Sequence, residues 1–177
     1  YAREAGARAG KQFRFTLTTN AVLLDDEAMD FLNREDISLI LSLDGRESVN
    51  DAMRLDASGR GSYNRVVDRI DHCLDSRRKF GTSAYAIIRG TYTGANLDFA
   101  ADVLHLANRG YLNLSMEPVV VGPGEPYALR DEHLPALSAE YEKLAREYLR
   151  RREEGVPFTF YHFELDLRQG PCLPKRL

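Results

Sequence analysis

The sequence predicts an α/β fold in which strands and helices alternate along the chain. Segments with the apolar spacing of amphipathic helices follow short segments that are rich in β-branched and aromatic residues. Two predicted strands, over 37–43 and 84–88, are almost continuously apolar, which is typical of strands in a parallel sheet. Strands separated by helices need parallel crossover connections. We therefore expect either a (β/α) barrel or a doubly wound sheet.

The first half of the chain contains start and stop signals for these elements. Gly10 is placed to end a helix, and the segment from Phe13 to Thr19 alternates apolar and polar side chains as a strand does. Asp25 and Asp26 bring an N-cap and a first-turn acidic side chain to the next helix. The predicted order is a helix over 1–10, a strand over 13–19, a helix over 26–34, a strand over 37–43 and a polar stretch over 44–61.

The second half continues the alternation. Ser62 is expected to cap a helix, and Gly110 and Gly155 are placed to end two others. A loop rich in Pro and Gly separates the last predicted helix from the strand before it. The predicted order is a helix over 63–79, a strand over 84–88, a helix from 96 or 98 to 108, a strand over 112–116, the loop over 121–126, a helix over 131–154 and a strand over 156–164.

Composition excludes several classes of function. The 177 residues carry 24 Lys and Arg against 27 Asp and Glu, a formal charge of −3, so we expect neither nucleic acid nor an anionic membrane as a partner. No apolar run approaches the roughly 20 residues that cross a bilayer. Cys73 and Cys172 form neither a disulfide framework nor a complete metal site. The chain opens without Met and ends in a loop-like stretch, so we expect a fragment of a longer protein.

Polar or charged side chains follow every predicted strand. Functional sites in parallel α/β folds gather at the carboxyl ends of strands. Arg89 stands out, because an apolar strand should not end in a bulky cation without a partner, whereas Asp44 before Gly45 is also an ordinary turn pair. Together these side chains suit a polar ligand with a carboxylate, hydroxyls and an amine. The candidates are Asn20, Ser42, Asp44, Arg89, Glu117, His162 and Glu164.

The strand exits and the segments after them form a longer pattern. This pattern resembles the radical S-adenosylmethionine (SAM) enzymes of the SPASM group, in which Ser-(Ile/Leu)-Asp-Gly is followed by His-Asp, Arg and Gly-x-Gly-Ser-(Phe/Tyr). The matching residues are Ser42-Leu43-Asp44-Gly45, Asn50-Asp51, Arg54 and Gly59-Arg60-Gly61-Ser62-Tyr63. Within that group the sequence is similar to the thioether-forming maturases of six-cysteine (SCIFF) peptides. That likeness rests on Arg89-Gly90-Thr91-Tyr92-Thr93, Asn96-Leu97-Asp98-Phe99, Met116-Glu117-Pro118-Val119-Val120 and Gly170-Pro171-Cys172.

The resemblance implies a fold, a set of cofactors and a reaction. Residues 1–164 would be an incomplete part of the partial (β/α)6 barrel of radical SAM enzymes, and 165–177 would begin a C-terminal auxiliary-cluster region. The intact parent would bind SAM at a 4Fe–4S cluster and generate a 5′-deoxyadenosyl radical. This radical would abstract hydrogen from a small, ribosomally made, cysteine-rich precursor peptide, and a thioether crosslink would follow with help from auxiliary 4Fe–4S clusters.

The resemblance also implies roles for particular residues. Ser42 and Asp44 match the strand exit that contacts the ribose or methionyl part of SAM. Arg89 matches the exit where a basic side chain pairs with the methionyl carboxylate through a charge-assisted hydrogen bond. Asn20 and Glu117 line the same mouth of the barrel and receive no sharper role.

The sequence departs from the family pattern in several places. The Cys-x-x-x-Cys-x-x-Cys loop and the Gly-Gly-Glu strand exit are absent and would belong upstream by family order. Cys172 would be a ligand of an auxiliary cluster in the intact parent only, so this chain alone is expected to be inactive. Asn50 replaces the commoner His, and Ala21 replaces a Gly. No secretory signal is recognisable, and together with the oxygen-sensitive chemistry this predicts a cytoplasmic protein.

Two alternatives remain open from the sequence. The first is a non-catalytic relative of the barrel that binds a peptide. The second is a barrel glycoside hydrolase in which Asp44 and Glu117 act as paired carboxylates. The chain has no Trp, which weighs against a sugar-binding platform.

Overall fold

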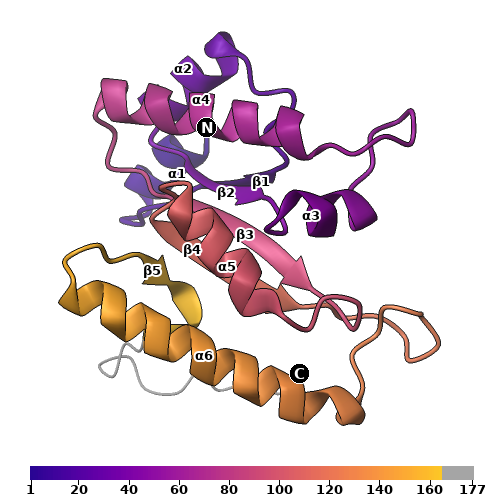
Figure 1. Cartoon of the computed structure of the whole chain (residues 1–177). Coiled ribbons are helices and arrows are strands. Elements are labelled where there is room, and N and C mark those ends of the chain that lie inside the picture. Colours follow the sequence, from indigo (N-terminus) through magenta and orange to yellow (C-terminus); the bar gives the residue numbers. More distant parts are fainter. Residues whose placement is uncertain (165–177) are drawn as a thin grey trace.

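A five-stranded parallel sheet runs through the protein, and its strands lie side by side in their order along the chain (Figure 1). The computed structural model describes residues 1–164. Parallel strands in unbroken chain order are the winding of a barrel, whereas the strand order of a doubly wound sheet reverses. The predicted α/β fold is therefore confirmed in its barrel form. The strands are β1 (Thr16–Thr19), β2 (Ser38–Ser42), β3 (Ala86–Tyr92), β4 (Asn113–Pro118) and β5 (Thr159–Phe160).

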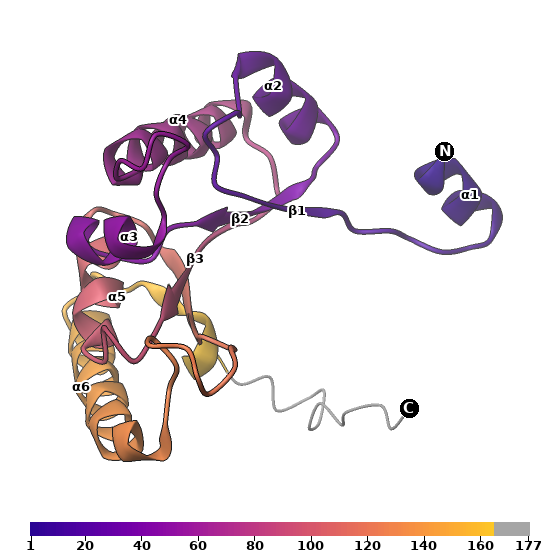
Figure 2. The ribbon, with the colours of Figure 1, turned by 90° about the vertical axis from the view of Figure 1, so that its right-hand side faces the viewer.

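Helices α2 to α6 lie along the outer side of the curved sheet, and none of these five lies on its inner side (Figure 2). Helix α1 lies at the side of this body of sheet and helices and contacts it through Arg3, whose Nε is 3.7 Å from Oε2 of Glu35. This one-sided coverage is what consecutive crossovers of the same hand produce. The helices are α1 (Ala2–Arg8), α2 (Asp26–Arg34), α3 (Glu47–Met53), α4 (Tyr63–Phe80), α5 (Phe99–Asn108) and α6 (Leu134–Glu153), with short 3₁₀ turns η1 (Asp131–His133) and η2 (Tyr161–Phe163).

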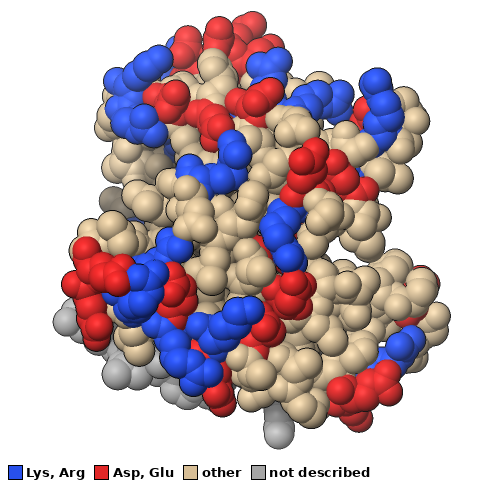
Figure 3. All heavy atoms as spheres, viewed as in Figure 1, with Lys and Arg blue, Asp and Glu red and all other residues tan. Residues whose placement is uncertain are grey.

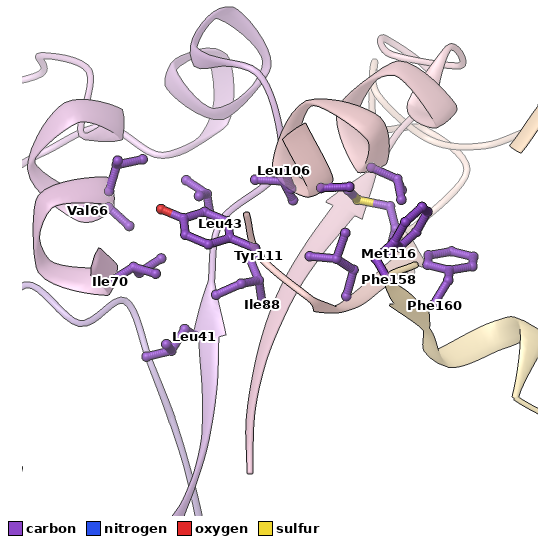
Figure 4. Packing of buried hydrophobic residues seen from close by; sticks show 14 of the residues in the cluster. Leu41, Leu43, Val66, Ile70, Ile88, Leu106, Tyr111, Met116, Phe158 and Phe160 are labelled. Carbon is purple, nitrogen blue, oxygen red and sulfur yellow. The ribbon is translucent and has the colours of Figure 1, made fainter. Parts of the chain in front are cut away.

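Strand alternation separates an apolar outer face from a mixed inner face. Leu39, Leu41 and Leu43 are fully buried under the helices, while Ile40 and Ser42 between them are only partly covered. The outer-facing side chains pack with the helices into one core that also includes Val66, Ile70, Leu106, Met116 and Phe160 (Figure 4). We expected β2 to be buried on both faces. It is fully buried on its outer face and only partly covered on its inner face.

Several element bounds differ from those expected. The first strand begins only at Thr16, where pairing with Ser38 of β2 begins. The polar stretch after β2 contains helix α3, which the sequence did not predict. The last strand is two residues long, because the chain turns into η2 after pairing Leu114 with Phe160.

The third and fourth strands extend further than their apolar segments do. The β3–β4 ladder continues through the pairs Thr91 with Glu117 and Tyr92 with Pro118. Arg89 and Glu117 therefore lie inside strands rather than after them. Backbone pairing with a neighbour, not side-chain polarity, decides where these strands end.

The outer surface carries charges of both signs. Lys and Arg are interspersed with Asp and Glu over the face in Figure 3 and form no continuous field of one sign. Within residues 1–164, no helix combines the length and apolar character needed to cross a membrane.

Candidate functional site

The sequence-predicted residues gather on the inner face at the carboxyl edge of the sheet. Ser42 of β2 is the register partner of Arg89 of β3, and Arg89 is the partner of Ser115 of β4. Thr91 pairs with Glu117 in the same ladder. Paired positions of neighbouring strands present their side chains to the same face. The structure thus brings Ser42, Arg89 and Glu117 onto one surface.

A pocket of about 280 Å³ lies on this inner face. Arg89 and Glu117 provide its charged groups, and aliphatic side chains of β2 and β3 provide an apolar part. Tyr85 and Tyr161 also line it, although sequence reasoning missed both. Tyr85 was detectable in principle, because it lies two strand periods before Arg89 and so faces the same side. The lining residues are Ile40, Tyr85, Ile87, Arg89, Ser115, Glu117 and Tyr161.

Arg89 is a half-exposed cation with a loosely placed partner. Its side chain is 49% exposed, and its Nε lies 3.8 Å from Oε1 of Glu117. That separation is within the range of an ion pair but is too long for a hydrogen bond. The guanidinium therefore keeps its donors for another acceptor.

Glu117 is held from two other directions. The hydroxyl of Ser115 donates to its Oε1 at 2.7 Å, and Nε2 of His162 lies 3.3 Å from the same oxygen. Every contact that the described residues make with this carboxylate falls on Oε1. Oε1 is therefore shared by three side chains, and the Glu117 side chain as a whole is 27% exposed.

The carboxylate of Asp44 is hydrogen-bonded to other groups of the protein. Its side chain is 5% exposed, and Arg54 donates to its two oxygens at 2.6 and 2.8 Å. The backbone N–H of Thr91 donates to the same carboxylate at 2.9 Å. Three charge-assisted or backbone hydrogen bonds leave little acceptor capacity for a ribose. The geometry shows Asp44 joining the exits of β2 and β3.

The motif residues after Asp44 form a brace between α3 and α4. Asp51 accepts hydrogen bonds from the backbone N–H groups of Ser62 and Tyr63, at 2.9 and 2.8 Å, and so caps the start of α4. The expected side-chain cap by Ser62 is not formed; its hydroxyl donates to the carbonyl of Arg54 instead, at 2.6 Å. Asn50 donates to Asp51 at 3.0 Å. Arg54 follows directly after α3, so this brace holds it within hydrogen-bond distance of Asp44.

A second brace holds the turn after β2. Asp102 of α5 is fully buried and accepts from the backbone N–H and the Nε of Arg46 at 3.0 and 2.8 Å. The hydrogen bond to Asp102 raises the pKa of Arg46. Gly45 adopts a φ of +118°, and a Cβ there would lie 2.3 Å from the Cβ of Asp102. Only glycine fits this turn without strain.

The first strand exit differs in character. Asn20 is exposed, and its Oδ1 accepts from the backbone N–H of Val22 at 3.2 Å, which closes a local turn. Ala21 in that turn has a φ of +64°, a left-handed conformation that glycine adopts more easily. This explains why the related pattern has a Gly at the position of Ala21.

The cysteines give no cluster site within the described residues. Cys73 is buried in α4, and burial raises the pKa of its thiol to about 11, which disfavours the thiolate that binds metal. Residues 1–164 contain no group of three or more His, Cys, Asp and Glu that could hold a metal ion. Cys172 lies outside the described residues.

Comparison with solved structures supports the fold. Native anSMEcpe with bound AdoMet and Kp18Cys peptide superposes with a TM-score of 0.74 at 14% identity, over 91% of this chain and 44% of that chain. The same protein with bound AdoMet alone gives 0.73 at 14% identity, over 91% and 43%. The chain thus spans less than half of the length of these proteins. No family model matches the sequence, and no curated protein is detectably similar to it.

Proposed function

We propose that this chain is part of a radical SAM enzyme of the SPASM group that modifies a ribosomally made peptide. The observation that carries the proposal is the placement of Ser42 and Arg89 as register partners on the open inner face, at the carboxyl edge of the sheet. The fold shared with anSMEcpe, whose structures hold AdoMet and a peptide, supports it. The order of motifs along the sequence supports it independently.

The inner face suits the polar groups of SAM. The half-exposed guanidinium of Arg89 binds the methionyl carboxylate. The hydroxyl of Ser42 and the amide of Asn20 offer hydrogen bonds to the remaining polar groups, and Glu117 lines the same mouth. When bound to a reduced 4Fe–4S cluster, SAM supplies a 5′-deoxyadenosyl radical that abstracts hydrogen. Asp44 acts indirectly, because its pairing with Arg54 and Thr91 spaces the two strand exits.

The finer assignments rest on sequence resemblance. They are hydrogen abstraction followed by thioether crosslinking of a small cysteine-rich precursor peptide in the intact parent. Residues 1–164 supply part of the barrel, and 165–177 begin the auxiliary-cluster region in which Cys172 is a ligand. The glycosidase alternative is less well supported, because Asp44 is engaged by Arg54 and is not free to transfer protons.

Binding of SAM to this chain tests the proposal without cluster chemistry. At 20.0 kDa the protein suits two-dimensional NMR with a ¹⁵N label, which detects weak binding. We expect shifts at Asn20, Ser42 and Arg89, and an affinity about tenfold lower for Arg89→Gln, the scale of one charged hydrogen bond. Arg78→Gln is the matched control, because Arg78 is an exposed arginine of α4. Shifts confined to the outer helices, or no shifts at all, would refute the proposed cofactor site.

A further inference from the structure

We propose that His162 is a positioning residue of the candidate site, which holds Glu117 on the β4–β5 side so that Arg89 stays free to bind an anionic group. This inference rests on the proposed function for the identity of the anion. The contacts that carry it are those of Glu117 with Ser115, His162 and Arg89, at 2.7, 3.3 and 3.8 Å. The shortest of these contacts is with Ser115 and the longest is with the cation of Arg89.

The first step concerns what Glu117 would otherwise do. A carboxylate next to a guanidinium frequently forms a bidentate pair with two parallel hydrogen bonds. Such a pair would use the Arg89 donors and neutralise the cation at the mouth. In the structure Oε1 is shared by the hydroxyl of Ser115, Nε2 of His162 and, at 3.8 Å, Nε of Arg89, and no bidentate pair forms. Arg89 remains 49% exposed.

The second step concerns how firmly His162 is placed. It lies in η2, directly after β5, and its ring is 5.3 Å from the ring of Phe160 between centroids. The next residue, Phe163, packs edge-on against Tyr148 of α6 at 5.3 Å. Tyr148 also donates to Glu164 at 2.9 Å. The turn is thus attached to α6 through the two residues that follow His162.

The third step concerns the atom that faces Glu117. Nε2 of His162 is buried and has no hydrogen-bond partner of good geometry among the described residues. It lies 3.3 Å from Oε1 of Glu117. Buried polar atoms in folded proteins nearly always have a polar partner. Glu117 is the polar group that faces Nε2, so we assign the role of His162 to this contact.

A measurement without ligand tests the positioning directly. His162→Phe preserves the ring packing but removes Nε2, so Glu117 should close on Arg89. The Nε–H of Arg89 should then exchange with solvent about threefold more slowly, a change in the range of half-exposed ion pairs. His162→Gln should restore the faster exchange, since its amide can donate to Glu117. In the Glu117→Gln variant, a further His162→Phe change should leave the exchange rate of the Arg89 Nε–H unchanged.

A pair of ligands then tests the consequence for binding. SAM and decarboxylated SAM differ in the carboxylate that Arg89 would bind. His162→Phe should weaken SAM about threefold and leave decarboxylated SAM unchanged. Equal weakening of both ligands, or unchanged exchange at Arg89, would overturn the inference. If wild-type protein bound no SAM, the proposed function would fail, while the exchange measurement would still decide the role of His162.

Discussion

Replacing Asp44 by Asn tests the claim that this residue braces the site. Asp44 accepts two hydrogen bonds from Arg54 at 2.6 and 2.8 Å and one from Thr91 at 2.9 Å. Breaking a fully buried ion pair costs about 3–5 kcal/mol, whereas an exposed pair contributes about 1 kcal/mol or less. Arg54 is 34% exposed and can regain water. We therefore expect a loss of about 2 kcal/mol, between these limits.

The assay is urea and thermal unfolding followed by circular dichroism. For a chain of this size, a loss of about 2 kcal/mol lowers Tm by about 4–8 °C. Asp75→Asn is the matched control, because Asp75 is 55% exposed and pairs with Arg78 within one helix; its effect should stay within about 0.5 kcal/mol. A cycle with Arg54→Leu should give a coupling of about 1–2 kcal/mol. A loss below about 0.5 kcal/mol for Asp44→Asn, or zero coupling, would refute the brace.

Two further changes test other parts of the structure. Gly45→Ala should cost about 2–4 kcal/mol in urea unfolding, because its Cβ would clash with Asp102, whereas Gly59→Ala, also at positive φ but with no atom within 4 Å, should cost about 1 kcal/mol. A larger loss for Gly59→Ala would contradict the steric explanation. Hydrogen bonding from Arg150 lowers the pKa of Glu147 to about 2 from 4.5, so its stabilisation is present above pH 4.5 and is lost as the pH falls through about 2. Glu147→Gln should therefore be less stable than wild type at pH 6, and the difference should shrink as the pH falls through about 2; an unchanged difference in thermal stability across that range would disprove the coupling.

The alternating elements were predictable because local periodicity reports which side chains are buried. The leucines of β2 and the helical spacing of apolar residues after Ser62 both indicated elements that the structure contains. The ends of β3 and β4 were not predictable, since Arg89, Thr91 and Glu117 are polar residues in strand conformation. Pairing with a neighbouring strand holds them there, and that pairing is not encoded in local polarity.

The candidate site was partly predictable for a topological reason. Parallel strands carry their carboxyl ends to one edge, so polar residues expected near those ends, such as Ser42, Arg89 and Glu117, must come together even where the strands run further than expected. The sequence could not show that Asp44 is engaged by Arg54, because the segment between them has to fold into α3 before the two side chains meet. It placed Glu117 and His162 at the ends of successive strands but could not show that Nε2 of His162 faces Oε1 of Glu117.

The sequence by itself determined the order of elements, the parallel sheet and the chemical types at its carboxyl edge. These follow from local spacing and from the limited number of ways in which strands and helices can be connected. Only the tertiary structure decided which polar groups are engaged with each other and which stay open. Asp44 is closed off by Arg54, while Arg89 remains available beside Glu117. Such contacts join residues on different elements, and they depend on sheet curvature and on how each connecting segment folds back, which no local pattern records.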